Sequence, residues 1–230
     1  TVGGGGGAAA VDAGRRQSLT AIAPFSVLPA ELELNYAAGA TVTRAVTVEN
    51  RSGQRIQVTC APEAILLAEG TVAPSCQRWI KLWPDTFALQ PGARQTVQML
   101  LTIPEAEWGG RYADLVFAAR PATPDDGAWS ARSGTRVHLT VGKDQVVEGT
   151  LSPVFIEDAG ATLGKLTGTV FTNTGSVHVT PRTGVQLKTS GGSGAWTLLH
   201  SVDLGRESVA VLPGEEREIV VSLPAAMGPG

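Results

Sequence analysis

The side chains best suited to acid–base or metal chemistry in this sequence are three histidines, His138, His178 and His200. A catalytic histidine needs a nucleophile or a carboxylate within hydrogen-bond reach, and no paired motif accompanies any of the three. His138 and His178 alternate with apolar residues, a pattern that favours solvent-facing positions on strands. The sequence therefore predicts no catalytic residue, no metal site and no cofactor. A hydrolase, the enzymatic alternative, would need a pocket centred on a histidine.

Two cysteines, Cys60 and Cys76, are the only ones in the chain. Their spacing fits no zinc or redox motif. A disulfide between them is the favoured interpretation, and two reduced, buried cysteines are the alternative. A disulfide closing a loop of this size would contribute about 3 kcal/mol in the chain-entropy model. Because it would need an oxidising compartment, the protein is expected to be exported, to the cell surface, the periplasm or the extracellular space.

Tryptophans in predicted loops are the candidate partner contacts. Trp108 and Trp129 both fall between predicted strands. An exposed indole in a loop can contact carbohydrate or protein, whereas capping of the core is the alternative for both residues.

Charge and hydropathy argue against two classes of protein. The net charge is −3 and the sequence has no basic stripe that could neutralise phosphates, so nucleic acid is not an expected partner. No apolar run approaches the roughly 18–20 residues that span a bilayer. A signal peptide or an anchor outside the given sequence stays an open alternative.

The elements that must position these side chains are short strands separated by turn residues. In Val42–Val48, for example, valines alternate with threonine and alanine, as in a half-buried strand. Strands at this spacing predict an all-β fold of two tandem immunoglobulin-like antiparallel β-sandwiches. The expected domains are residues 19–142 and 143–230. Residues 1–18, which include a pentaglycine, are expected to form a flexible tail.

The two halves of the chain repeat each other loosely. The matched segments are Val48–Gly53 with Phe171–Gly175, Leu89–Gly92 with Val211–Gly214, and Val97–Pro104 with Ile219–Pro224. Asn at the end of a strand and Pro-Gly before the next strand are turn signals with a defined geometry. The repeat therefore predicts a similar order of strands and turns in both domains.

The repeat breaks after its last matched strand. In the first half Pro104 is followed by Gly110 and a further apolar strand, whereas Pro224 is followed at the same spacing by Gly230, where the given sequence ends. The second sandwich is therefore expected to lack its last strand, with an open edge at Ile219, Val221 and Leu223. Either the given sequence ends early, or a strand of another copy or of a partner completes the domain by β-augmentation.

These motifs carry a family resemblance. The segments that carry it are Asn50, Phe87–Gly92, Val97–Pro104 and Gly110–Tyr112 in the first half, and Asn173–Val179 with Pro213-Gly214 in the second. They resemble bacterial surface and periplasmic immunoglobulin-like proteins, including the tandem-domain WxL-interacting proteins of cell walls and, more distantly, the pilus-chaperone-like sandwiches. The resemblance to the wall proteins implies adhesion or scaffolding, with peptidoglycan or a surface protein as ligand.

The leading functional hypothesis is a non-catalytic structural or adhesion protein that acts through strand or loop contacts, as a subunit of a polymer completed by strand donation. The alternatives are a monomeric module that binds cell-wall glycan or protein, and a periplasmic chaperone-like protein. The expected partners are other protein chains, a second copy of this chain among them, and cell-wall glycan.

Overall fold

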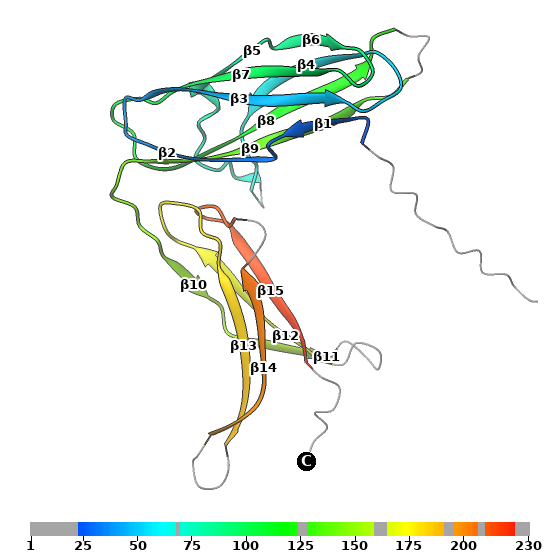
Figure 1. Ribbon diagram of the computed structural model, residues 1–230. Coiled ribbons are helices and arrows are strands. Elements are labelled where there is room, and N and C mark those ends of the chain that lie inside the picture. The colour runs from blue at the N-terminus through cyan, green and yellow to red at the C-terminus, as the bar shows by residue number, and fades with distance from the viewer. Residues whose placement is uncertain are drawn as a thin grey trace, which may run out of the picture.

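The computed structural model describes residues 23–67, 70–123, 128–158, 165–190, 196–206 and 210–223. Within these ranges the regular structure is β-strand, apart from a 3₁₀ turn at Gln77–Trp79 (η2), so the predicted all-β class is confirmed. Strands β1–β9 form one body, called here the first half, and β10–β15 form another, the second half (Figure 1). The predicted tail, residues 1–18, lies outside the described residues.

The first half is a closed sandwich of two sheets. Its strands are β1 (Phe25–Leu28), β2 (Glu31–Tyr36), β3 (Thr41–Asn50), β4 (Ile56–Glu63), β5 (Ile80–Trp83), β6 (Thr86–Leu89), β7 (Arg94–Thr102), β8 (Gly109–Pro121) and β9 (Ala131–Val141). One sheet has the order β1-β3-β7-β5 and the other β2-β9-β8-β4-β6. The chain changes sheet between β1, which pairs antiparallel with β3, and β2, which pairs parallel with β9.

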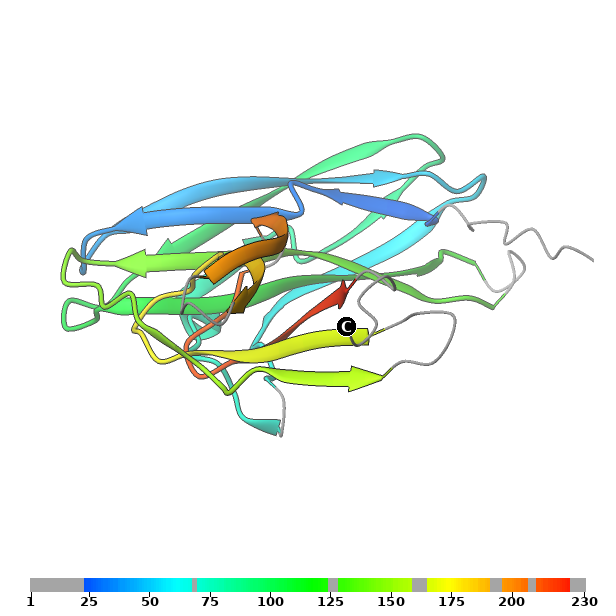
Figure 2. The same cartoon turned by 90° about the horizontal axis from the view of Figure 1, so that it is seen from below.

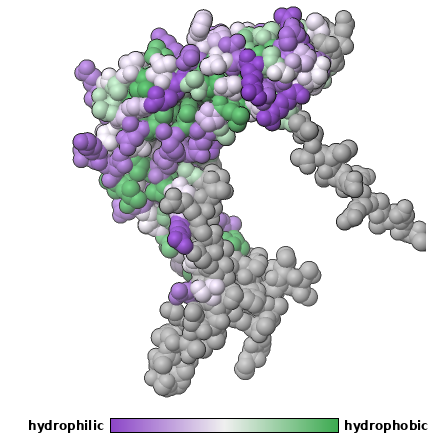
Figure 3. Space-filling model, viewed as in Figure 1, coloured by the Kyte–Doolittle hydropathy of each residue, from purple (hydrophilic) through white to green (hydrophobic). Residues whose placement is uncertain are grey.

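The core of the first half lies between these sheets. Alternation along the strands aims every second side chain inward, and the inward residues are almost fully buried. They include Phe25, Val46, Val48, Ile56, Val58, Val97, Met99, Leu101, Leu115, Phe117 and Leu139. On the face shown in Figure 3, apolar and polar residues of this half are interspersed.

The second half is a smaller pair of layers. Its strands are β10 (Gly149–Leu151), β11 (Phe155–Asp158), β12 (Lys165–Asn173), β13 (Arg182–Ser190), β14 (Trp196–Arg206) and β15 (Glu216–Leu223). Strand β12 pairs with β10 and β11 and, through its whole length, with β15. Strands β13 and β14 form a separate hairpin, which Figure 2 shows nearly end-on beside the other sheet. The predicted boundary after residue 142 falls between the end of β9 and the start of β10.

The repeat seen in the sequence is present in the structure, where it takes the form of a corner built on a buried asparagine. Asn50 ends β3 and Asn173 ends β12, and their side chains are 1% and 0% exposed. Each backbone carbonyl accepts a hydrogen bond from the turn glycine, Gly92 at 3.0 Å and Gly214 at 2.8 Å. Both glycines have a positive φ, 72° and 79°, which glycine adopts without steric cost.

The side-chain amides of the two asparagines form matching hydrogen bonds. Asn50 Nδ2 donates to the carbonyls of Leu89, Gln90 and Gln54, and Asn173 Nδ2 donates to those of Val211 and Val177. Each Oδ1 accepts a backbone N–H two residues further along, from Ser52 and Gly175. Each asparagine side chain therefore pairs several backbone groups of its corner. This matters because a buried carbonyl is costly to leave without a hydrogen bond.

Strand pairing corrects one detail of the predicted repeat. Strand β12 pairs with β15 as β3 pairs with β7, and Val97 and Ile219 occupy matching positions. The register, however, places Leu223 opposite Lys165, so that Leu223 matches Leu101 and not Ile103 as the sequence alignment suggested. In the sequence, Pro224 therefore follows Ile219 two residues sooner than Pro104 follows the matching Val97.

Candidate functional site

A groove with mostly apolar walls lies in the second half. Its volume is about 610 Å³. It runs between the sheet of β10, β11 and β12 and the free edge of β13. The lining side chains and backbone belong to Gly149, Leu151, Val154, Ile156, Thr167, Gly168, Thr169, Phe171, Pro181, Arg182, Gly184, Gln186 and Ile219.

Large apolar side chains in this groove are left in water. Leu151 is 66% exposed, Val154 69% and Ile156 63%. Positions matched by the repeat show the contrast, because Val48 is fully buried in the first half whereas its counterpart Phe171 is only partly buried. Exposed apolar surface of this kind, rimmed by polar residues, marks an interaction site.

The groove lies where the first half carries β8 and β9. Chain order makes β13 the counterpart of β4 and β14 that of β6, because β12 and β15 match β3 and β7. In the first half β4 is paired with β6 on one edge and with β8 on the other. Strand β13 is paired with β14, and no strand among the described residues follows its other edge. Among the described residues that edge has no neighbouring strand, and it borders the apolar walls of the groove.

Strand β15 carries the residues predicted to form an open edge. It pairs with β12 on one side, and the described residues place no strand on its other side. In the first half the matching strand β7 also pairs with β5. Ile219 is buried at 6% exposure and lines the groove, while the side chains of Val221 and Leu223 lie outside the described part of the chain.

A second cluster, called here the junction cluster, lies where the two halves meet. It consists of Glu31, Glu33, Tyr112, His138 and His178. Parallel pairing of β2 with β9 sets Glu33 beside His138, and antiparallel pairing of β8 with β9 sets Tyr112 opposite the same residue. His178 comes from the second half, in the segment after β12.

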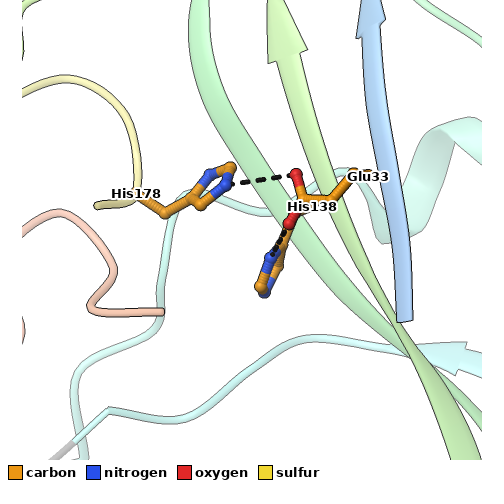
Figure 4. A group of neighbouring side chains, drawn as sticks. All are labelled: Glu33, His138 and His178. Carbon is orange, nitrogen blue, oxygen red and sulfur yellow. Dashed lines mark hydrogen bonds and ion pairs between the residues drawn. The ribbon is translucent and has the colours of Figure 1, made fainter. Parts of the chain in front are cut away.

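The Asn173 corner positions His178. Asn173 Nδ2 holds the carbonyl of Val177, whose side chain is buried, and Val179 forms a bridge with Val211. His178, between these two anchored residues, points at Glu33 of the first half (Figure 4). Its Nε2 lies 3.2 Å from Glu33 Oε2, and its Nδ1 lies 3.5 Å from the Tyr112 hydroxyl.

Backbone and apolar contacts join the halves next to this cluster. The N–H of Gly110 donates to the carbonyl of Ser176 at 2.7 Å. A Cβ at Gly110 would clash with the Tyr112 hydroxyl of the same strand and would lie 3.1 Å from the Ser176 carbonyl oxygen of the second half, so both contacts favour glycine there. Tyr112 is fully buried and packs with Leu212 of the second half, in a cluster with Ile65 and Ala73.

The histidines correct the sequence interpretation. His138 and His178 were expected to face solvent on separate strands, but their ring centroids are 4.6 Å apart and their side chains are 2% and 15% exposed. They are 40 residues apart and lie in different halves, so no local pattern could bring them together. His200 is on β14, opposite Leu187.

The disulfide expected between Cys60 and Cys76 is not formed in this structure, where both are buried free cysteines. The reason is their place along β8. Cys60 lies opposite Phe117, whereas Cys76 follows Ser75, which bridges to Tyr112. Five residues of strand separate the two places, so the α-carbons lie roughly 12 Å or more apart, beyond the span of a disulfide.

The loop tryptophans are not brought together. Trp108 directly precedes β8 and is 57% exposed. Trp129 lies beyond the other end of β8 and packs partly against the core of the first half. Since β8 spans Gly109–Pro121, about 40 Å of strand lies between them, and they do not form a shared platform for a glycan.

No protein-family model and no curated protein sequence matches the chain. Solved structures match at low identity. A chaperone–tip adhesin complex described as vital for CFA/I fimbriae biogenesis has a TM-score of 0.51 and 13% identity over 85% of each chain. The class 5 fimbriae chaperone CfaA has a TM-score of 0.49 and 12% identity over 87% of each chain.

A third structure, the CsuC–CsuE chaperone–tip adhesion subunit pre-assembly complex of Acinetobacter baumannii, has a TM-score of 0.49 and 11% identity, covering 89% of this chain and 90% of that chain. At such identities the likeness to the first of these structures shows the fold alone, a two-domain β-sandwich. The resemblance to the WxL-interacting proteins is not confirmed by these structures and stays a prediction. No helix in the described ranges is long and apolar enough to cross a bilayer.

Proposed function

We propose that this chain is an exported, non-catalytic protein that binds an extended apolar segment of a partner protein, which adds as a strand to the free edge of β13 and fills the groove of the second half. One observation carries the proposal: the apolar walls at Leu151, Val154 and Ile156 are exposed, yet they line the place that β8 and β9 fill in the first half.

The groove supplies both kinds of contact that strand addition uses. The free edge of β13 gives backbone hydrogen bonds, and the apolar walls receive alternate side chains of the added strand. Burying one large apolar side chain contributes about 1.5–3 kcal/mol. A partner strand with apolar residues at alternate positions, like β8 itself, is therefore the chemistry that fits.

The fold supports a protein partner. One structure with the same fold is a chaperone–tip adhesin complex, and the partner proposed here is also a protein. A second copy of this chain is one such partner. Sedimentation of the chain alone over a range of concentrations distinguishes self-association from binding of a different protein.

A peptide in place of the missing strand tests the proposal. The probe is a fluorescent synthetic peptide with the sequence of residues 111–119, a central part of β8, the strand that pairs with β4 in the first half. Saturable binding, measured by fluorescence anisotropy, is expected with the full chain. A peptide of the same composition with its alternation scrambled should bind at least about tenfold more weakly, because it loses one buried side chain or more.

Matched variants locate the binding. Val154→Asp should weaken binding by about tenfold or more, since it places a charge in the groove. Val147→Asp is the control, because Val147 is as exposed at 72% but does not line the groove. Equal affinity of the two variants, or no saturable binding by the unmodified chain, contradicts the proposal.

A chaperone-like role at the junction is the second candidate, favoured by a pocket of about 460 Å³ that residues of both halves line, among them Arg132, Arg136 and Ala210. Both arginines are already paired, Arg132 with Glu63 and Arg136 with Asp114, so a partner carboxylate would have to displace an acidic side chain. If this pocket is the binding site, Arg136→Ala weakens peptide binding and Val154→Asp does not.

A further inference from the structure

The junction cluster places two imidazoles on one carboxylate. His138 Nδ1 lies 2.8 Å from Glu33 Oε1, and His178 Nε2 lies 3.2 Å from Glu33 Oε2 (Figure 4). Ligand atoms of these three residues all lie within 4.8 Å of one another. A fourth group is at hand, because Glu31 Oε1 lies 2.7 Å from His138 Nδ1.

These separations suit a small tetrahedral ion. Zinc binds imidazole nitrogen and carboxylate oxygen at about 2.0–2.1 Å, so neighbouring ligand atoms in a tetrahedral site lie about 3.3 Å apart. The two Glu33 contacts are already near that value. Glu33 and Glu31 are 59% and 47% exposed, so their carboxylates can adjust and the site is open to ions from solvent.

The charge of the cluster also calls for a cation. With both imidazoles neutral, as coordination requires, two carboxylates give the cluster a charge of −2. The nearby cation Arg136 is engaged by Asp114 through both of its carboxylate oxygens, at 3.0 and 3.1 Å.

Tyr112 forms the wall behind the two imidazoles. It is fully buried, and its ring meets both histidine rings edge-on at 5.7 Å. The Tyr112 hydroxyl lies 3.5 Å from His178 Nδ1, the position of an outer partner that orients the ring with Nε2 toward Glu33.

We propose that Glu33, His138 and His178, with Glu31 as the fourth ligand, form a binding site for a divalent transition-metal ion, with zinc as the best match. Three of these ligands belong to the first half and His178 to the second. Ion binding therefore ties the two halves together and holds the second half, with its groove, at a fixed orientation. Imidazole with carboxylate selects such ions over magnesium and calcium, which prefer oxygen ligands alone.

Calorimetric titration of the full chain tests the site, using protein purified without a histidine tag and stripped with a chelator. Zinc chloride should bind at one equivalent near neutral pH. Glu33→Gln and His178→Gln should each lower the affinity by about tenfold or more, because each removes a ligand. His200→Gln, which changes the remaining histidine in the chain, is the matched control and should bind zinc as the unmodified chain does.

A stability measurement gives the second readout. Zinc should raise the melting temperature of the unmodified chain and of His200→Gln, by the linkage between binding and folding, and should raise that of His178→Gln less at the same zinc concentration. Magnesium chloride should have no such effect. Folded, unmodified chain that takes up no zinc, cobalt, nickel or copper ion overturns the proposal, and so does equal zinc affinity in all of the variants.

Discussion

The two asparagine corners have matching hydrogen bonds, but the segments that follow them differ. Asn50 and Asn173 use the same donor and acceptor atoms to close a strand end and a glycine turn. After Asn50 the chain enters β4 and the sandwich closes. After Asn173 the chain presents Ser176 and His178 to the first half before it enters β13. A repeated corner therefore fixes local geometry, while the residues that follow it decide what the corner is used for.

The sandwiches around these corners differ in closure. In the first half β8 and β9 complete a sheet and the core residues are almost fully buried. In the second half the same inward positions border a groove, and three large apolar side chains stay more than half exposed. The described residues of the second half therefore form the two layers of a sandwich, with a groove where β8 and β9 lie in the first half.

Truncation of one phenylalanine in each half should show the largest effect and the clearest difference between the halves. Phe117→Ala removes a fully buried ring from a closed core and should cost about 3–5 kcal/mol of unfolding free energy. Phe171→Ala removes a partly exposed ring that covers Gly149, and should cost less than about 2 kcal/mol because less surface is lost. Urea unfolding measures both, and equal losses would break the comparison.

Changes at the two asparagines should come next in size. Asn50→Ala and Asn173→Ala each leave buried carbonyls without a donor, which should lower the unfolding free energy by about 2–3 kcal/mol. Only Asn173→Ala should also weaken zinc binding, since Asn173 positions His178. Titration of both variants with zinc separates the two corners, and the same affinity for both would show that His178 is held by other contacts.

Thiol labelling reports on the first half alone, because Cys60 and Cys76 both belong to it. Burial raises the pKa of the Cys60 thiol to about 11 and that of Cys76 to about 12. A shift of this size in Cys60 reduces its thiolate, the reactive form, roughly hundredfold. Iodoacetamide should therefore label neither residue in folded chain near neutral pH, and both after denaturation. Denatured chain without reactive thiols would instead indicate a disulfide.

The smallest effect is expected at the outer edge of β15. Val220 is 43% exposed and matches Gln98, an exposed residue of β7. Val220→Gln should change the unfolding free energy by less than about 0.5 kcal/mol, as surface substitutions do. Thermal or urea unfolding of this variant is the measurement, and a loss of about 1 kcal/mol or more, twice that limit, would indicate that this face of β15 is covered.

The sequence allowed the strands, the two-sandwich class and the repeated corner to be predicted, because alternation and turn residues act locally. It did not allow the junction cluster to be predicted. Glu33 meets His138 through a parallel pairing of β2 with β9, and His178 arrives from the other half. The disulfide prediction failed for a related reason, since the spacing of two cysteines in the sequence does not show which residues of β8 each of them lies beside.

Amide hydrogen exchange on the full chain tests the central claim most directly, that the free edge of β13 accepts a strand. With the peptide of residues 111–119 in saturating amount, amides of β13 (Arg182–Ser190) should exchange more slowly, and those of β3, β4 and β7 in the first half should be unaffected. Exchange in β13 that does not change on peptide addition, or that slows equally in both halves, would contradict the account.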